Sequence, residues 1–381
     1  MRILVLGYVI KSPLGGLVWS HLQYMIGLKR LGHQVLFLED SDDFPACYNP
    51  DTFLVDTDPS YGLRFIAQVF DAYDLKDQWA YYDAHSGHWY GQGRQAVLAF
   101  CAGADLVLNL GAVTPLRDWW LGIPVRVLVD TDPAFTQVRH LTEPATHHVA
   151  RQHTHFFSFA ENINTPGCTV PPDGFPWQPT RQPFVAEAWK PSPPQPAGDW
   201  TTVMQWNSYQ VRTYNGQVFG MKSESFKDFE DLPRRLPGER FELVVDGSAE
   251  LIAHLEGLGW RTRSSVKVTR TPWTYQQYIG QSKGEWSVAK HGYVASNSGW
   301  FSERSLSYLA TGRPVLVQDT GFTRLFETGK GLFAFTTPEE ALEGMREIDR
   351  DYLFHCRTAR AFVEMHFEAT RVLRELLNRI S

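Results

Sequence analysis

The first forty residues carry the pattern that most restricts the fold. Residues 2–8 form a continuous apolar run, and residues 34–38 form a second one. Between them, Gly15 and Gly16 are followed by apolar residues at helical spacing up to Leu31. A strand that is apolar along its whole length is typical of a parallel sheet covered by helices on both faces. The order of strand, glycine loop, helix and strand therefore predicts a βαβ unit.

Three later apolar runs, at residues 104–110, 123–130 and 155–159, predict further strands of the same sheet. Acidic side chains follow two of these strands: Asp130, Asp132 and Glu161. Ligands of open α/β sheets bind beyond the carboxyl ends of the strands, so we expect at least one of these acids to serve catalysis or acceptor binding. Capping of the following helices would also place acids there.

The chain divides at a proline-rich segment. Residues 191–199 hold four prolines and lack any periodicity, which predicts a linker rather than a long surface loop. A length of 381 residues also indicates two domains, here residues 1–190 and 200–353.

Charge is distributed unequally between the two halves. The formal net charge of −6 resides wholly in residues 1–195, which hold 13 Lys and Arg against 19 Asp and Glu. The second half is balanced, so it would repel an anionic ligand such as a nucleotide diphosphate less. A pI near 6.1 argues against a nucleic acid as the main partner.

Cysteine spacing and hydropathy exclude several other classes of protein. Four widely separated cysteines favour a reduced cytoplasmic protein over a disulfide framework or a zinc site, and we expect no metal site. The apolar run at residues 3–10 is too short to cross a bilayer, so we expect no transmembrane segment.

Nicotinamide binding is disfavoured by the first glycine loop. Gly7 and Gly15 are too far apart for a G-x-G-x-x-G fingerprint. Glu39 ends the second predicted strand, where a ribose-binding acid would lie, but a single acid is a weak signal.

A glycine and a lysine mark the first loop of the second half. Gly220 and Lys222 lie in a segment that leads into a predicted helix near Phe226. Free backbone N–H groups and an ammonium group suit a phosphate, so Lys222 is a candidate phosphate ligand. A solvated surface lysine is the alternative.

A second glycine turn opens a further helix in this half. Residues 286–293 predict a strand followed by a polar turn with His291 and Gly292, and a helix begins near Ser302. A helix N-terminus carries unpaired N–H groups and a partial positive charge that suit a pyrophosphate. Arg304 could add a bidentate bond to phosphate, and Glu303 could accept bonds from sugar hydroxyls. An ordinary capped helix would share these features.

These motifs resemble those of two-domain GT-B glycosyltransferases. The glycine pair and a helix ending in Gly32-His33 are similar to the amino-terminal domain of that superfamily. Residues 286–322, with Ala310-Thr311-Gly312-Arg313-Pro314-Val315 at the end of the helix, resemble its donor-binding element. The resemblance implies an α/β fold of two Rossmann-like domains facing a cleft, with residues 354–381 crossing back to the first domain.

One departure from the superfamily lies in the donor element. Retaining members with the glycine pair carry two glutamates with seven residues between them, at positions that are Gly299 and Ser307 in this chain. The arrangement Ser302-Glu303-Arg304 instead resembles spore-coat-type glycosyltransferase-like proteins.

The resemblance implies a metal-independent hexosyltransferase that uses a nucleotide diphosphate sugar and needs no other cofactor. Its acceptor would be a small molecule, a glycan or a lipid, bound to the first domain. The candidate catalytic residues are Asp130, Asp132, Glu161 and His21. The candidate donor-binding residues are Gly15, Gly16, Lys222, His291, Gly292, Ser302, Glu303, Arg304, Gly321 and Phe322. A sugar-nucleotide epimerase and a non-catalytic sugar-nucleotide or glycan-binding protein are the alternatives.

Overall fold

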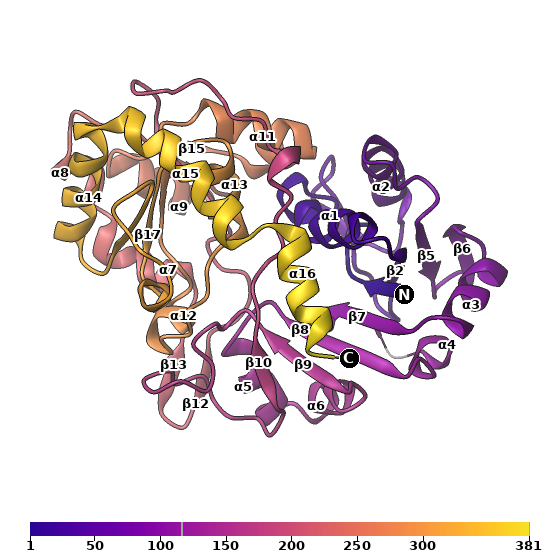
Figure 1. Cartoon of the computed structure of the whole chain (residues 1–381). Coiled ribbons are helices and arrows are strands. Elements are labelled where there is room, and N and C mark those ends of the chain that lie inside the picture. The colour runs from indigo at the N-terminus through magenta and orange to yellow at the C-terminus, as the bar shows by residue number, and fades with distance from the viewer. Residues whose placement is uncertain (116, 381) are drawn as a thin grey trace.

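The computed structural model describes residues 1–115 and 117–380. Ser381, the last residue of the predicted crossing segment, lies outside this range. Two mostly parallel sheets lie side by side, each with helices packed around it (Figure 1). We call the part built on the sheet of β1 the first lobe and the part built on the sheet of β11 the second lobe.

The first sheet has eight strands in the described part of the chain, and only β6 runs antiparallel to its neighbour. In spatial order the strands are β10 (Trp177–Pro179), β9 (His155–Ser158), β8 (Val125–Asp130), β7 (Leu106–Leu110), β1 (Arg2–Leu6), β2 (Gln34–Asp40), β5 (Trp79–Asp83) and β6 (His88–Gly91). The other elements of this lobe are α1 (Gly15–Arg30), the hairpin of β3 (Cys47–Asn49) and β4 (Leu54–Asp56), α2 (Ser60–Ala72), α3 (Arg94–Ala102), α4 (Asp118–Leu121), α5 (Phe135–Thr142), α6 (Pro144–Ala150) and the 3-10 helix η1 (Ala186–Ala188).

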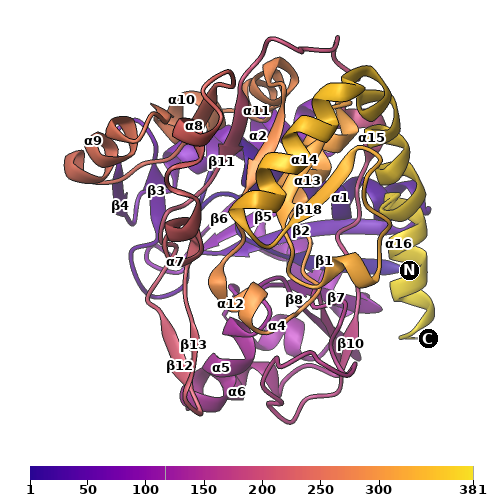
Figure 2. The same cartoon turned by 90° about the vertical axis from the view of Figure 1, so that its left-hand side faces the viewer.

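The second sheet has six parallel strands among the described residues. Their order is β15 (Arg261–Arg263), β14 (Phe241–Val244), β11 (Trp200–Val203), β16 (Gly284–Ser287), β17 (Val315–Gln318) and β18 (Leu332–Phe335). A hairpin of β12 (Arg212–Tyr214) and β13 (Gln217–Phe219) extends from this lobe toward α5 (Figure 2). The 3-10 turns are η2 (Lys227–Phe229) and η3 (Phe322–Arg324).

Ten helices belong to the second lobe and the C-terminal segment in the described chain. They are α7 (Lys222–Phe226), α8 (Leu232–Arg235), α9 (Ala249–Gly257), α10 (Ser265–Thr269), α11 (Pro272–Gln281), α12 (His291–Ala295), α13 (Glu303–Ala310), α14 (Pro338–Arg350), α15 (Tyr352–His366) and α16 (Ala369–Asn378). No helix within residues 1–115 and 117–380 combines the length and the apolar character needed to cross a membrane.

The apolar runs of the sequence become the buried central strands. Ile3–Leu6 of β1 is completely buried, as expected for a strand with helices on both faces. One interpretation is wrong, because the expected turn around His291 and Gly292 is the start of the short helix α12. The proline-rich residues 191–199 lie between β10, the last strand of the first sheet, and β11, the first strand of the second.

Each sheet reverses its strand order once at a central position. β1 lies between β2 and β7, and β11 lies between β14 and β16. The connections leave such neighbouring strands in opposite directions, which opens a crevice at their carboxyl ends. The topology therefore places one ligand-binding edge on each lobe.

The C-terminal segment crosses between the lobes, as the resemblance implied. α15 packs on α13 and α16 packs on α1, which is the diagonal path of the yellow ribbon in Figure 1. Leu373 of α16 lies against Gly27 of α1. Helix α15, the first helix of this segment, spans Tyr352–His366.

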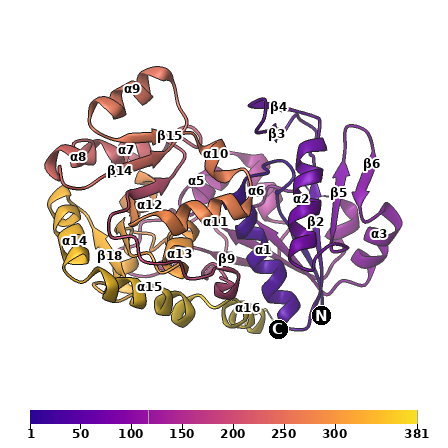
Figure 3. The same ribbon diagram turned by 90° about the horizontal axis from the view of Figure 1, so that it is seen from above.

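Glycines allow the lobes to approach closely at two points. α1 of the first lobe lies beside α11 of the second (Figure 3), and a Cβ atom on Gly15 would overlap the backbone carbonyl of Thr271. A Cβ atom on Gly292 of α12 would lie 2.6 Å from the ring of Phe135 in α5. Larger residues at either position would separate the two sheets.

We predict that Gly15→Ala lowers the stability of the protein by about 1–3 kcal/mol, because the added methyl group meets rigid backbone rather than a movable side chain. Thermal unfolding followed by calorimetry measures the effect. Gly93→Ala is the control, since nothing lies within 4 Å of the added Cβ atom there and Gly93 also lies at the start of a helix, as the N-cap of α3. Equal melting temperatures for the two variants would contradict the close-approach role of Gly15.

Candidate active site

Two cavities open at the carboxyl edges of the sheets. The large cavity has a volume of about 560 Å³ and lies between the loop after β1 and the ends of β11 and β14, with residues such as Gly16, Met204 and Asp246 in its wall. The small cavity has a volume of about 180 Å³ and is lined mainly by the first lobe. Its wall comprises Tyr8, Leu17, Ser20, His21, Tyr24, Leu110, Thr131, Phe159, Gln182, Pro183, Trp300 and Glu303.

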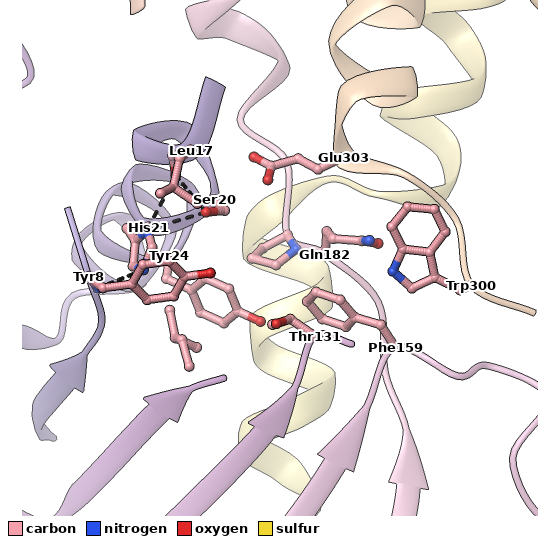
Figure 4. Close-up of a pocket in the computed structure, with 12 residues that line it drawn as sticks. Tyr8, Leu17, Ser20, His21, Tyr24, Thr131, Phe159, Gln182, Trp300 and Glu303 are labelled. Atoms are coloured by element: carbon pink, nitrogen blue, oxygen red, sulfur yellow. Dashed lines mark hydrogen bonds between the residues drawn. The ribbon is translucent and has the colours of Figure 1, made fainter. Parts of the chain in front are cut away.

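The two cavities adjoin, because Leu17 and Glu303 belong to the walls of both. Glu303 is the first residue of α13, and its carboxyl group points across the small cavity toward α1 (Figure 4). A ligand in the large cavity and a ligand in the small cavity would therefore meet at this carboxyl group.

The loop that follows β1 is shaped by Glu39, at the end of β2. Its carboxylate accepts three backbone hydrogen bonds, from Val9 and Ile10 at 2.6 Å and from Lys11 at 2.7 Å. Burial raises the pKa of Glu39 to about 7, although Lys11 and the three N–H groups act in the opposite direction. This acid binds the loop of its own chain and not a ribose, which agrees with the argument against nicotinamide.

The glycine pair begins α1 at the wall of the large cavity. Gly16 lies in that wall, with Tyr275 of α11 opposite it. Ser12 and Leu14 of the preceding loop line the same cavity. Of the two predicted donor-binding glycines, Gly16 thus lies at the cavity, whereas Gly15 lies outside the described wall and against the backbone of the second lobe.

Arg304 lies in the wall of the large cavity and is hydrogen-bonded to the strands beside it. Its guanidinium group donates to Glu285 at 2.5 Å, to the carbonyl of Val203 at 3.0 Å and to the hydroxyl of Ser287. These bonds join α13 to the ends of β11 and β16. The bidentate phosphate contact expected from the sequence would compete with them, so we assign Arg304 a supporting position beside the cavity.

Lys222 differs from Arg304 in having no partner. Its side chain is buried, and no hydrogen bond or ion pair joins its ammonium group to another of the described residues. Burial, together with the nearby Arg304, lowers the pKa of Lys222 well below its usual value. An anionic ligand would compensate this buried cation.

Asp132 joins the two lobes. It accepts hydrogen bonds from Lys290 at 3.0 Å and from the hydroxyl groups of Tyr209 and Tyr293, all three in the second lobe. Desolvation and this carboxylate raise the pKa of Tyr209 and Tyr293 above the ordinary tyrosine value. Both carboxylate oxygens of this expected catalytic acid therefore accept bonds from the second lobe, and Asp132 acts here as a contact between lobes.

The other predicted bases are also engaged. Asp130 accepts bonds from Gln137 at 2.9 Å and Ser158 at 2.7 Å, and Glu161 accepts two bonds from Arg181. Burial raises the pKa of Asp130, and it raises that of Glu161 to about 7. Neither acid belongs to the wall of the two cavities.

His21 lines the small cavity but has both ring nitrogens occupied. Its Nε2 accepts from the backbone N–H of Tyr8 at 3.2 Å, and its Nδ1 lies 3.3 Å from the carbonyl of Leu17. Burial lowers the pKa of His21 to about 4, so the ring is neutral. This geometry gives His21 a structural role in the cavity wall.

The remaining predicted donor residues lie around the second lobe's edge. His291 accepts the backbone N–H of Gly220 at 3.3 Å, which joins α12 to the loop before Lys222. Ser302 is the N-cap of α13, and Phe322 packs its buried ring 5.1 Å from that of Phe301. Gly321 has a positive φ of 97° and lies against Asn162 and Asn297, where a side chain would overlap both.

Gly299 explains one departure from the superfamily pattern. It has a positive φ of 75°, and a Cβ atom there would lie 2.8 Å from the side chain of Asn162. A glutamate at this position would require the adjoining loop of the first lobe to move. Glu303, four residues further along the chain and the first residue of α13, is the acid that lines both cavities.

Glu303 has no compensating partner. Its Oε1 is buried without a hydrogen bond, and burial raises the pKa of the carboxyl group to about 8. Glu303 is among the donor-site residues expected from the sequence, whereas Tyr24, which faces the same cavity three residues after His21, is not. A spacing of three residues places Tyr24 on the same face of α1 as His21, and this is the sequence signal that could have identified Tyr24. Within residues 1–115 and 117–380, no group of three or more His, Cys, Asp or Glu side chains could hold a metal ion.

Solved structures share this architecture over the whole chain. HepE from Anabaena in complex with UDP-glucose is 13% identical, with a TM-score of 0.58 over 100% of this chain and 99% of that one. An alpha-glucosyltransferase in complex with UDP and a mismatched DNA is 12% identical, with a TM-score of 0.56 over 99% and 98%. The chain has the GT-B fold. No protein-family model and no curated protein sequence matches it.

The GT-B fold confirms the fold class expected from the sequence. HepE was also solved with UDP and glucose, at 15% identity and a TM-score of 0.56 over 100% of this chain and 99% of that one. DNA is a partner of the alpha-glucosyltransferase. For this chain, the absence of a nucleic-acid partner stays a prediction.

We predict that Glu303→Gln stabilises the protein at high pH. Because the folded-state pKa of about 8 lies above the ordinary 4.5, the folded state binds more protons between these values, and stability falls as pH rises through that window. The variant should gain about 2–4 kcal/mol over the wild type at pH 9 relative to pH 4.5.

Urea unfolding at both pH values measures this difference. Glu327→Gln is the control, since that side chain is 77% exposed and should show little change. A stability gain of Glu303→Gln that is independent of pH would show that Glu303 is ionised in the folded protein.

Proposed function

We propose that this protein transfers a sugar from a nucleotide diphosphate sugar to an acceptor hydroxyl group, without a bound metal ion. One observation carries the proposal: a large interlobe cavity and a small first-lobe cavity meet at Glu303. Group transfer between two substrates needs such a meeting point. UDP-glucose is the first donor to test, because proteins of similar fold hold UDP or UDP-glucose.

The large cavity suits the nucleotide diphosphate. Its volume lies within the range of ordinary ligand pockets, and Trp206, Asp246 and Ser265 offer an aromatic face and polar groups. The first turn of α13 borders it and presents unpaired N–H groups. Lys222 lies outside the described wall of this cavity, but it is buried and unpaired near Arg304, which belongs to that wall, and from there it would supply positive charge to the diphosphate.

The state of Glu303 favours a hydrogen-bonding role. A diphosphate in the large cavity would repel a carboxylate, which would raise the pKa of Glu303 beyond about 8. A neutral carboxyl group can instead donate a hydrogen bond to the sugar or to the leaving oxygen.

The acceptor hydroxyl must lose a proton during the reaction, and the candidate bases of the chain are already hydrogen-bonded to other groups. In the reaction, the bond from the anomeric carbon to the diphosphate oxygen breaks and a bond to the acceptor oxygen forms. Since Asp132 and His21 have their acceptor atoms occupied, the leaving diphosphate is the group we assign to take the proton. This corresponds to attack on the same face and retention of configuration, which NMR of the product anomer would test.

We predict that Lys222→Ala weakens UDP binding at least about tenfold, because a buried cation that compensates the diphosphate is lost. Isothermal titration calorimetry with UDP measures the affinity. Lys227→Ala is the control, since Lys227 is 61% exposed and pairs with Glu224. Failure of the wild type to bind UDP or any other nucleoside diphosphate would disprove the donor site.

We predict that kcat/KM for transfer falls as pH rises above about 8, because the neutral form of Glu303 is the active one in the free enzyme. Glu303→Gln keeps a donor and should retain activity without this decline, while Glu303→Ala should lose about a hundredfold in kcat. Release of UDP from UDP-glucose, with water or sugars as acceptors, is the assay. A rate that rises through pH 8 would make Glu303 a base, and binding of UDP-glucose with no turnover would favour a binding protein.

A further inference from the structure

Three buried polar atoms in the wall of the small cavity have no hydrogen-bond partner among the described residues. They are the hydroxyl of Tyr24, the indole Nε1 of Trp300 and the Oε1 of Glu303. The three residues come from α1, from the turn before α13 and from the first turn of α13. Burying a polar atom without a hydrogen-bond partner lowers the free energy of unfolding. The presence of three such atoms at one cavity therefore needs an explanation.

Unpaired indole nitrogens alone would not indicate a ligand. Those of Trp19, Trp189 and Trp286 are also buried without partners, but these side chains lie in the hydrophobic clusters and line neither the small nor the large cavity. What distinguishes Trp300 is its place: the indole edge in Figure 4 is turned toward the space that Glu303 also enters.

The rest of the wall is aromatic and uncharged. Tyr8, Phe159 and Trp300 contribute ring surfaces, and Thr131 and Gln182 add polar groups. No Lys or Arg belongs to the described wall, and the ring of His21 is neutral. A phosphate-bearing ligand would therefore find no counter-charge, whereas a neutral one would fit.

A saccharide ring has matching chemistry. Its C–H faces pack on aromatic rings, and its hydroxyl groups accept from and donate to polar atoms at the edges. A volume of about 180 Å³ is below that of pockets for drug-sized ligands, which indicates a single ring.

We propose that the small cavity binds one neutral saccharide ring of the acceptor, with Tyr24 and Trp300 donating to its hydroxyl groups and Glu303 contacting the hydroxyl that reacts. The inference rests on the proposed function, because the shared position of Glu303 is what makes this ring the acceptor. It narrows the acceptor to a free or terminal sugar and excludes a lipid chain or a duplex nucleic acid as the group held in this cavity.

The test uses the methyl glycosides of glucose, galactose, mannose and N-acetylglucosamine as probes. Ligand-detected NMR titrations of the full-length chain, with and without saturating UDP, give the affinities. At least one glycoside should bind, and Tyr24→Phe and Trp300→Phe should each weaken that binding about five- to tenfold through loss of one hydrogen bond. The affinity for UDP, measured by calorimetry, should change less than about twofold in both variants.

Tyr90→Phe is the matched control, because it removes a hydroxyl from a side chain that is 36% exposed on β6, outside both cavities. If the protein binds UDP but none of the four glycosides, the inference is overturned while the proposed donor site stands. Unchanged glycoside affinity in both Tyr24→Phe and Trp300→Phe would also overturn it. Glycoside binding in a protein that binds no nucleoside diphosphate would support the sugar cavity and disprove the proposed function. Trp300→Phe retains a large ring, so it provides the answer if Tyr24→Phe fails to fold.

Discussion

The close approach of the two lobes at glycine positions is the constraint on which the cavities depend. Backbone of α11 occupies the place of a side chain at Gly15, the ring of Phe135 does so at Gly292, and Asn162 does so at Gly299. These contacts bring the carboxyl ends of both sheets together. They also position α1 and α13, which hold the residues that line the junction of the cavities.

Polar contacts between the two lobes then stabilise one relative orientation of the lobes. Asp132 binds Lys290 and two tyrosine hydroxyls across the lobes, and Asn162 donates to the carbonyls of Asn297 at 3.1 Å and Gly321 at 3.0 Å. Because buried charges are stable only when paired, the carboxylates of Asp132 and Glu161 are used for contacts within the protein and not for ligand binding. Lys222 and Glu303 are the exceptions that matter for chemistry.

The sequence was sufficient for the fold because its signals are local. Apolar runs and glycine loops at residues 2–40 and 286–318 determine strands and helices, and the order of these elements implies two parallel sheets. Residues of the site were harder to select, since an acid after a strand, such as Asp130 or Asp132, looks the same whether it meets a ligand or another side chain. Only the packing of the second lobe shows that Asp132 is occupied and that Tyr24 faces a cavity.

The raised pKa of Glu303 results from its buried position at the start of α13. A carboxylate at the first position of a helix is ordinarily stabilised by the partial positive charge of the N-terminus. Here burial outweighs that effect and raises the pKa to about 8, since no cation or donor reaches Oε1 among the described residues. The nearest arginine along the chain, Arg304, is bound to Glu285 instead. The fold thus keeps one neutral acid between two cavities, which is useful where a dianion must bind beside a sugar hydroxyl.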